Sequence, residues 1–108
     1  MNENKIKSCF NLLKNENSIF LNFIKAKYPI FHNSNFFFRD LQYGLMRFLE
    51  KKDITVSYPE AAVLAEKLGK FFEDQAIFTK VNSTAWRLNY PEFVTTAPGD
   101  PFDMKNAN

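Results

Sequence analysis

The sequence predicts a small α+β domain in which helices precede a β-hairpin. Over most of residues 5–76, apolar side chains recur at intervals of three and four, which is the spacing of one helix face. From residue 77 to residue 90 the spacing changes to every second residue, on both sides of a short polar turn, which is typical of two paired strands. Apolar residues make up 45% of the 108 residues, and Phe alone occurs 13 times, so the chain can bury a core.

Two helices are expected in the first 35 residues. The apolar residues of segment 5–13 share one helix face: Ile6, Cys9, Phe10 and Leu13. Segment 18–28 has a second such face: Ile19, Phe20, Phe23 and Ile24. Asn17 or Ser18 is expected to cap this second helix, and Pro29 is expected to end it. Two lysines, Lys25 and Lys27, lie off its apolar face.

A third helix is expected from about residue 36 to residue 52, with Ser34 or Asn35 as its N-cap. Its apolar residues fall on one face: Phe38, Leu41, Leu45, Phe48 and Leu49. Gly44 lies inside this helix, where it weakens the helix by about 1 kcal/mol relative to alanine. The β-branched segment that follows, residues 53–57, indicates extended chain.

A fourth helix is expected from about residue 58 to residue 76. Ser57 and Glu60 have the spacing of a capping box, and Pro59 stands in the first turn, where its missing N–H costs little. The apolar residues of this helix again form one stripe: Ala61, Leu64, Ala65, Leu68, Phe71 and Phe72. The start of this helix is therefore the sharpest local signal in the sequence.

A β-hairpin is expected over residues 77–90, with its turn at Asn82-Ser83-Thr84. Residues 91–108 contain three prolines and a glycine among acidic and Asn residues, and they predict an extended C-terminal tail. Phe93 or Phe102 is expected to pin this tail to the domain.

A set of short motifs runs through residues 36–90: Phe38-x-Asp40-Leu41 with Phe48-Leu49, Ser57-Tyr58-Pro59-Glu60-Ala61-Ala62, Leu68, Ile77-Phe78-Thr79-Lys80-Val81 and Trp86-Arg87-Leu88. The expected order of elements is helix, short strand, helix and hairpin, which is the winged-helix layout. With these motifs, residues 36–90 resemble the DEP type of winged-helix domain. Ala76 stands where that family has a glycine. The resemblance implies an α+β winged-helix core at 36–90. Residues 1–35 lie outside it and are expected to form an N-terminal helical pair packed on this core, and residues 91–108 are expected to form the tail.

The residues offer little support for catalysis or for a metal site. A nucleophile needs a base and an orienting group, and the single imidazole, His32, is expected in a solvated loop. The single thiol, Cys9, lies on an apolar helix face and is expected to be buried. One His and one Cys do not make a structural zinc site, and no glycine-rich phosphate loop is present. We therefore expect no enzymatic activity, no cofactor and no metal.

The lone cysteine and the lack of a secretory signal or an apolar run of membrane length predict a cytoplasmic protein without a transmembrane segment.

Charge is distributed unevenly along the chain. Residues 1–52 carry a net charge of +5 and residues 53–108 a net charge of −3, within a total of +2. Such asymmetry marks either a solvated surface or a basic interaction face. If the protein binds nucleic acid, the expected contacts are Lys5, Lys7, Lys25, Lys27, Lys80 and Arg87. The fourth helix has a net charge of −2, which disfavours it as a DNA-reading helix.

A protein-binding adaptor or a small assembly subunit is the leading functional hypothesis, and a DNA-binding winged helix is the alternative. The DEP resemblance implies signalling proteins or anionic membrane surfaces as partners, and a homodimer is a further option. The candidate partner surface consists of Phe36, Phe37, Arg39, Arg47, Lys51 and Lys52. Phe36, Phe37 and Phe38 span about 200° of a helix circumference, so they cannot all face one core. Either the first two helices cover the remainder, or one Phe is exposed to a partner.

Overall fold

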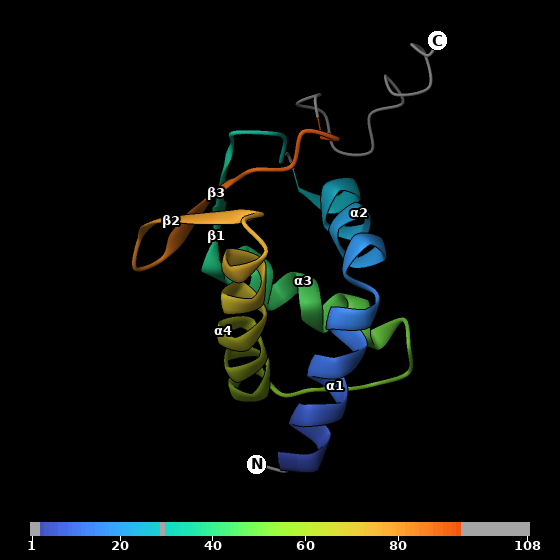
Figure 1. Ribbon diagram of the computed structural model, residues 1–108. Helices are drawn as coiled ribbons and strands as arrows, with labels where there is room; N and C mark the ends of the chain where they lie inside the picture. Colours follow the sequence, from blue (N-terminus) through green and yellow to red (C-terminus); the bar gives the residue numbers. More distant parts are fainter. Residues whose placement is uncertain (1–2, 29, 94–108) are drawn as a thin grey trace, which may run out of the picture.

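The computed structural model describes residues 3–28 and 30–93. The elements follow in the order α1 (Glu3–Asn15), α2 (Asn17–Lys27), β1 (Asn35–Phe37), α3 (Phe38–Glu50), α4 (Tyr58–Asp74), β2 (Phe78–Asn82) and β3 (Ala85–Leu88). The expected α+β class is confirmed, with four helices and a three-stranded antiparallel sheet in this part of the chain. Figure 1 shows α1 and α4 side by side, with the sheet near the C-terminal end of α4.

The sheet has the strand order β1-β3-β2. The predicted hairpin is formed by β2 and β3, with a register shift between Lys80 and Asn82. Strand β1 pairs antiparallel with the other edge of β3, and Phe36 lies opposite Trp86. The hairpin thus gains a third strand from a segment more than forty residues earlier in the chain.

The prediction that the third helix begins at about residue 36 is wrong, because residues 35–37 form β1 and α3 begins at Phe38. Neither Ser34 nor Asn35 caps this helix: Phe37 is the N-cap residue and makes no side-chain capping bond, while the Ser34 hydroxyl accepts from the Phe31 N–H. Strand pairing to β3 explains the difference, since local spacing does not reveal a distant partner strand. Residues 53–57 form no strand.

Helix α2 presents a different face to the core from the one its sequence indicates. Ile19 was expected inside but is 59% exposed, whereas Leu21 is buried. Lys25 was expected outside but is buried, and its Nζ donates to the Ile30 carbonyl at 3.1 Å. The helix is also not capped by Asn17 or Ser18, because Glu16 stands at the N-cap without a side-chain bond. Ile30 is itself buried and accepts the Lys25 hydrogen bond, so the buried face of α2 is turned relative to the predicted stripe.

The core is one cluster of aromatic and aliphatic side chains that draws on α1 through β3. The Phe20 ring of α2 packs edge to face on Phe48, with 5.3 Å between the ring centres. It also stacks with Phe72, with 6.4 Å between the ring centres. Phe78 continues this aromatic series, with its ring centre 4.9 Å from those of Phe72 and Trp86. The N-terminal helices therefore share the core of the remaining elements.

The predicted capping box is present at the start of α4. The Ser57 N–H donates to Oε1 of Glu60 at 2.8 Å, and the Glu60 N–H donates to the Ser57 hydroxyl at 3.2 Å. Lys5 of α1 adds an ion pair, with 3.3 Å between its Nζ and Oε1 of Glu60. The backbone hydrogen bond from Ser57, followed by the interactions with Lys5, holds the pKa of Glu60 below its ordinary value of 4.5.

The lowered pKa of Glu60 predicts a specific loss of stability in acid. The folded protein binds a proton at Glu60 more weakly than the unfolded chain, so the stabilisation is complete above about pH 4.5 and is lost as the pH falls through the lowered pKa. Glu60→Gln should therefore lower the urea midpoint at about pH 7 and lower it less at about pH 3. Glu66→Gln, an exposed position on the same helix, is the control. An equal loss at both pH values would contradict the prediction.

The end of α4 has the hydrogen bonds of a Schellman motif. The N–H of Ala76 donates to the Glu73 carbonyl and the N–H of Ile77 donates to the Phe72 carbonyl, at 3.0 and 2.9 Å. Ala76 occupies the position that favours glycine, and its φ is 62°, in the left-handed region. The left-handed conformation costs roughly 1–2 kcal/mol for a residue with a Cβ.

Ala76→Gly is therefore expected to raise the free energy of unfolding by about 0.5–1 kcal/mol, after allowance for the greater freedom of glycine in the unfolded chain. Urea unfolding at equilibrium measures this change. Ala62→Gly, in the second turn of α4, is the matched control and should lower stability by about 1 kcal/mol. A lower urea midpoint for Ala76→Gly would show that the left-handed backbone at this position is not strained.

Candidate functional site

Three large aromatic side chains are exposed around one groove. Phe37 is 49% exposed, Tyr58 is 48% exposed and Tyr43 is 40% exposed. Phe37 and Tyr58 line a groove of ≈ 550 Å³, and the ring centres of Tyr43 and Tyr58 are 5.5 Å apart. We call this the aromatic groove; its lining residues are Phe37, Phe38, Arg39, Asp40, Gln42, Tyr58 and Thr84.

Two hydrogen bonds between neighbouring elements hold the aromatic groove in place. The N–H of Phe38, at the junction of β1 and α3, donates to the Thr84 carbonyl in the hairpin turn at 2.8 Å. Nε2 of Gln42 donates to the Tyr58 carbonyl at 3.1 Å, which ties α3 to the first residue of α4. Strand alternation in β1 then turns Phe37 outward while Phe36 is buried. The backbone that carries Phe37 and Tyr58 is thus tied to neighbouring elements by hydrogen bonds.

The aromatic groove carries one charge of each sign. Arg39 is exposed, and Asp40 is half-buried in the first turn of α3. Burial raises the pKa of the Asp40 carboxyl, and the neighbouring Arg39 opposes this shift in part. The net charge of the lining is zero, so the groove favours an apolar segment with polar flanks over a polyanion.

Two residues of the predicted partner surface, Phe37 and Arg39, line this groove. The inclusion of Phe36 is wrong, because its side chain is 1% exposed and belongs to the core. The premise that Phe36, Phe37 and Phe38 lie on one helix is also wrong. Phe36 and Phe37 belong to β1, and only Phe38 belongs to a helix.

The remaining three predicted residues lie at the other end of α3. Arg47 forms an ion pair with Glu50, with 3.3 Å between Nη1 and Oε1. Lys52 forms an ion pair with Glu16, with 2.7 Å between Nζ and Oε1. Lys51 is exposed beside them. The structure does not bring these cations to the aromatic groove.

Tyr43 and Tyr58 were missed at the level of sequence. Both signals were nevertheless available: Tyr43 stands off the apolar stripe of its helix, and Tyr58 lies between a capping serine and a proline. One exposed aromatic residue carries little information, but adjacent exposed aromatic residues such as Tyr43 and Tyr58 mark an interaction surface.

The predicted nucleic-acid contacts do not form a single surface. Lys25 is wrong as a contact, because its ammonium is buried beside the Ile30 carbonyl and lies 5.7 Å from the centre of the Phe93 ring. Lys5 is engaged with Glu60. Four other cations are exposed, and they are divided among α1, α2 and the hairpin: Lys7, Lys27, Lys80 and Arg87.

His32 is less solvated than its sequence context indicates. Its Nδ1 accepts a hydrogen bond from the Tyr90 N–H at 3.1 Å, and the backbone N–H of His32 donates to the Phe93 carbonyl. Phe93 is buried, as expected for a residue that pins the segment after β3, while Phe102 lies outside the described residues. The contacts of His32 thus fasten residues 90–93 to the loop before β1.

Cys9 is buried as predicted, and burial raises the pKa of its thiol, with Lys5 opposing the shift. Within residues 3–28 and 30–93, no group of three or more His, Cys, Asp or Glu side chains is arranged to hold a metal ion. None of the helices described is long and apolar enough to cross a membrane.

The fold and its surface thus define a small α+β domain with an exposed aromatic groove. Comparisons of this chain with protein-family models, with characterised proteins and with solved structures find no match.

Proposed function

We propose that the protein is a non-enzymatic winged-helix interaction module that acts as a protein-binding adaptor or as a subunit of a small assembly. The observation that carries this proposal is the aromatic groove. Aromatic side chains and arginine supply most of the binding energy at protein interfaces. Exposed Phe37, Tyr43 and Tyr58 beside Arg39 provide that composition on a frame that is already in place.

The order of elements supports the winged-helix part of the proposal. From α2 onward the chain runs helix, short strand, helix, helix and hairpin, and the early strand lies beside β3. The short strand that the winged-helix layout requires is β1, not the segment 53–57 that the sequence indicated. In this interpretation α4 occupies the place of the recognition helix, and β2 with β3 forms the wing.

Charge favours a protein over a nucleic acid as the partner. The described part of α4 carries Lys67 and Lys70 against four acids: Glu60, Glu66, Glu73 and Asp74. Carboxylates on the helix that would enter a groove of DNA oppose the phosphates on either side. The aromatic groove is neutral, so we assign to it an apolar segment of a different protein, with polar residues on both flanks.

A photo-crosslinking experiment tests this assignment. A benzoyl-phenylalanine is placed at Phe37 in the full chain expressed in its own cells, and in a control it is placed at Ile19, which is also exposed. We expect a protein adduct from position 37 that is weakened by Tyr58→Ala, and none of comparable strength from position 19. The adduct should resist nuclease and be removed by protease.

Three outcomes would overturn the proposed function. Equal adducts from both positions would show that the aromatic groove is not a specific site. A crosslink between two copies of this chain would show that the aromatic groove is a homodimer interface and not a binding site for a different protein. Binding of duplex DNA at sub-micromolar affinity with a steep salt dependence would favour the DNA-binding alternative.

A further inference from the structure

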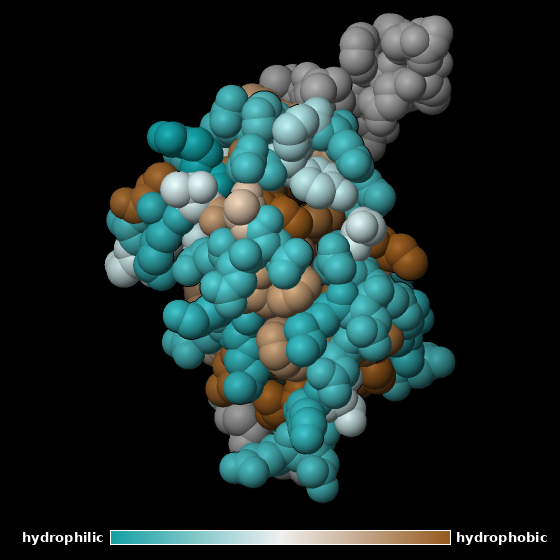
Figure 2. Space-filling view, in the orientation of Figure 1, coloured by the Kyte–Doolittle hydropathy of each residue, from teal (hydrophilic) through white to brown (hydrophobic). Residues whose placement is uncertain are grey.

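A second groove runs along the seam between α1 and α4. Where these two helices lie side by side, Figure 2 shows apolar atoms exposed between the hydrophilic side chains. One section of the groove, of ≈ 500 Å³, is walled by Phe10 of α1 and Phe71 of α4. The next section, of ≈ 630 Å³, shares Phe10 with the first and adds Ile6 and Val63. The two sections are open hollows that share Phe10 and Lys67 in their lining, and together we call them the seam groove.

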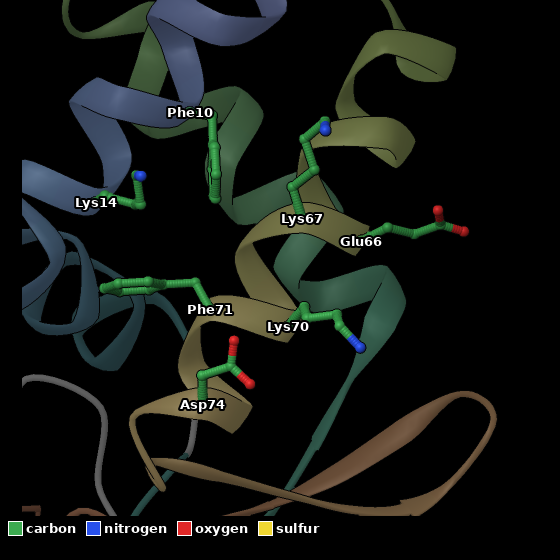
Figure 3. A pocket seen from close by; sticks show the side chains of 7 residues that line it. All are labelled: Phe10, Lys14, Glu66, Lys67, Lys70, Phe71 and Asp74. Atoms are coloured by element: carbon green, nitrogen blue, oxygen red, sulfur yellow. The ribbon is translucent and has the colours of Figure 1, made fainter.

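Lysines line the middle of the seam groove. Figure 3 shows Lys14 and Lys67 on opposite sides of the Phe10 ring, and their Nζ atoms lie 4.6 and 6.0 Å from its centre. Lys70 follows one turn along α4, and Lys7 lines the neighbouring section. No ion pair joins any of these four lysines to an acid within the described residues.

The acids of the seam groove lie away from this central part. Glu3 and Asp74 stand at its two ends, and Figure 3 shows the Glu66 carboxylate directed away from Phe10. Positive charge therefore flanks apolar side chains in the middle of the seam groove. The α4 residues that line it, from Val63 to Asp74, extend over about 16 Å, or about three helical turns.

We propose that the seam groove is a binding site for an acidic amphipathic helix of a partner protein. An amphipathic helix binds such a groove by placing its apolar face on the apolar lining, with anchors at helical spacing. Its flanking carboxylates would pair with Lys7, Lys14, Lys67 and Lys70. This site is separate from the aromatic groove and does not rest on the proposed function, although an adaptor needs two sites to join two partners.

The probe for the experiment is a synthetic helical peptide of about 14 residues, enough to fill the groove, with leucines on one face and glutamates on both flanks. It is titrated into the isotope-labelled full chain, and amide shifts are followed by NMR. We expect the shifts to concentrate on α1 and the outer face of α4, around Phe10 and Phe71. A peptide of the same composition, scrambled so that it has no apolar face, should bind at least about tenfold more weakly.

Charge removal supplies the matched comparison. Lys14→Gln with Lys67→Gln should weaken binding about tenfold. Lys51→Gln with Lys80→Gln removes the same charge from exposed positions elsewhere and should leave affinity unchanged. Thermal unfolding of each variant checks that the fold is retained.

The inference is overturned if the peptide causes no shifts along the seam groove, if both double variants lose affinity equally, or if the scrambled peptide binds as well. It is also overturned if a single-stranded RNA oligonucleotide binds the seam groove more tightly than the peptide at the same ionic strength. None of these outcomes depends on crosslinking at Phe37, so the two proposals fail or stand separately.

Discussion

Phe20→Ala is expected to lower the free energy of unfolding by about 3–5 kcal/mol, the range for removing a large buried aromatic side chain. The Phe20 ring is fully buried, and it joins α2 to both α3 and α4 through Phe48 and Phe72. Truncation would leave a cavity bordered by the rings of Phe48 from α3 and Phe72 from α4. Urea unfolding followed by the fluorescence of the single tryptophan, Trp86, measures the loss.

The neighbouring residue provides the control for this prediction. Ile19→Ala removes a side chain that is 59% exposed and should change stability by no more than about 0.5 kcal/mol. If Phe20→Ala is too unstable to purify, Phe20→Leu should still lower the urea midpoint well below that of Ile19→Ala. Equal effects at positions 19 and 20 would contradict the packing of α2 and favour the face that its sequence spacing indicates.

Local signals predicted most of the helices and the hairpin. The capping box at Ser57 places the start of α4 within one residue, because both of its hydrogen bonds are formed between residues three apart. The hairpin was equally accessible, since Trp86 and Leu88 alternate with a polar residue on a strand joined to its partner by a short turn. In both cases the interactions that define the element are close in sequence.

The predictions that were wrong concern residues whose contacts are far apart in the sequence. Strand β1 exists because Phe36 pairs across from Trp86, fifty residues away, and three consecutive Phe residues favour neither helix nor strand by spacing. Lys25 is buried in part because Phe93, which follows β3 in the chain, places its ring centre 5.7 Å from the Lys25 ammonium. These are tertiary contacts, and they decide burial against the local pattern.

The candidate site was predicted in part for the same reason. Arg39 was named because the DEP resemblance implies protein or anionic-membrane partners, and Phe37 was named because a run of three aromatic residues cannot be buried on one helix face. That premise was wrong, yet the exposure of Phe37 follows from strand alternation as well. Tyr58 joins the site only because α4 begins beside α3, where Gln42 donates to its carbonyl. The seam groove likewise depends on α1 lying along α4, which spacing within either helix does not indicate.

Gly69→Ala is expected to destabilise the protein by about 1–2 kcal/mol, although alanine is the better helix former. A Cβ at position 69 would lie 2.6 Å from Cζ2 of Trp86 and 3.0 Å from its Cη2. The indole has little room to withdraw, because its Nε1 donates to the Glu73 carboxylate at 2.7 Å. Phe78 also packs on the ring, with 4.9 Å between the ring centres.

Gly44→Ala is the informative comparison, because the same substitution in α3 meets a different obstacle. The added Cβ would press on the end of the Ile24 side chain, which can rotate away. The helical gain of about 1 kcal/mol then offsets most of the rotamer cost, so we expect a net change below about 1 kcal/mol. Urea midpoints of the two variants measured together check this order. A larger loss at position 44 would show that Trp86 is less firmly held than Ile24, and that the sheet, rather than α2, is the more adaptable partner of the helices.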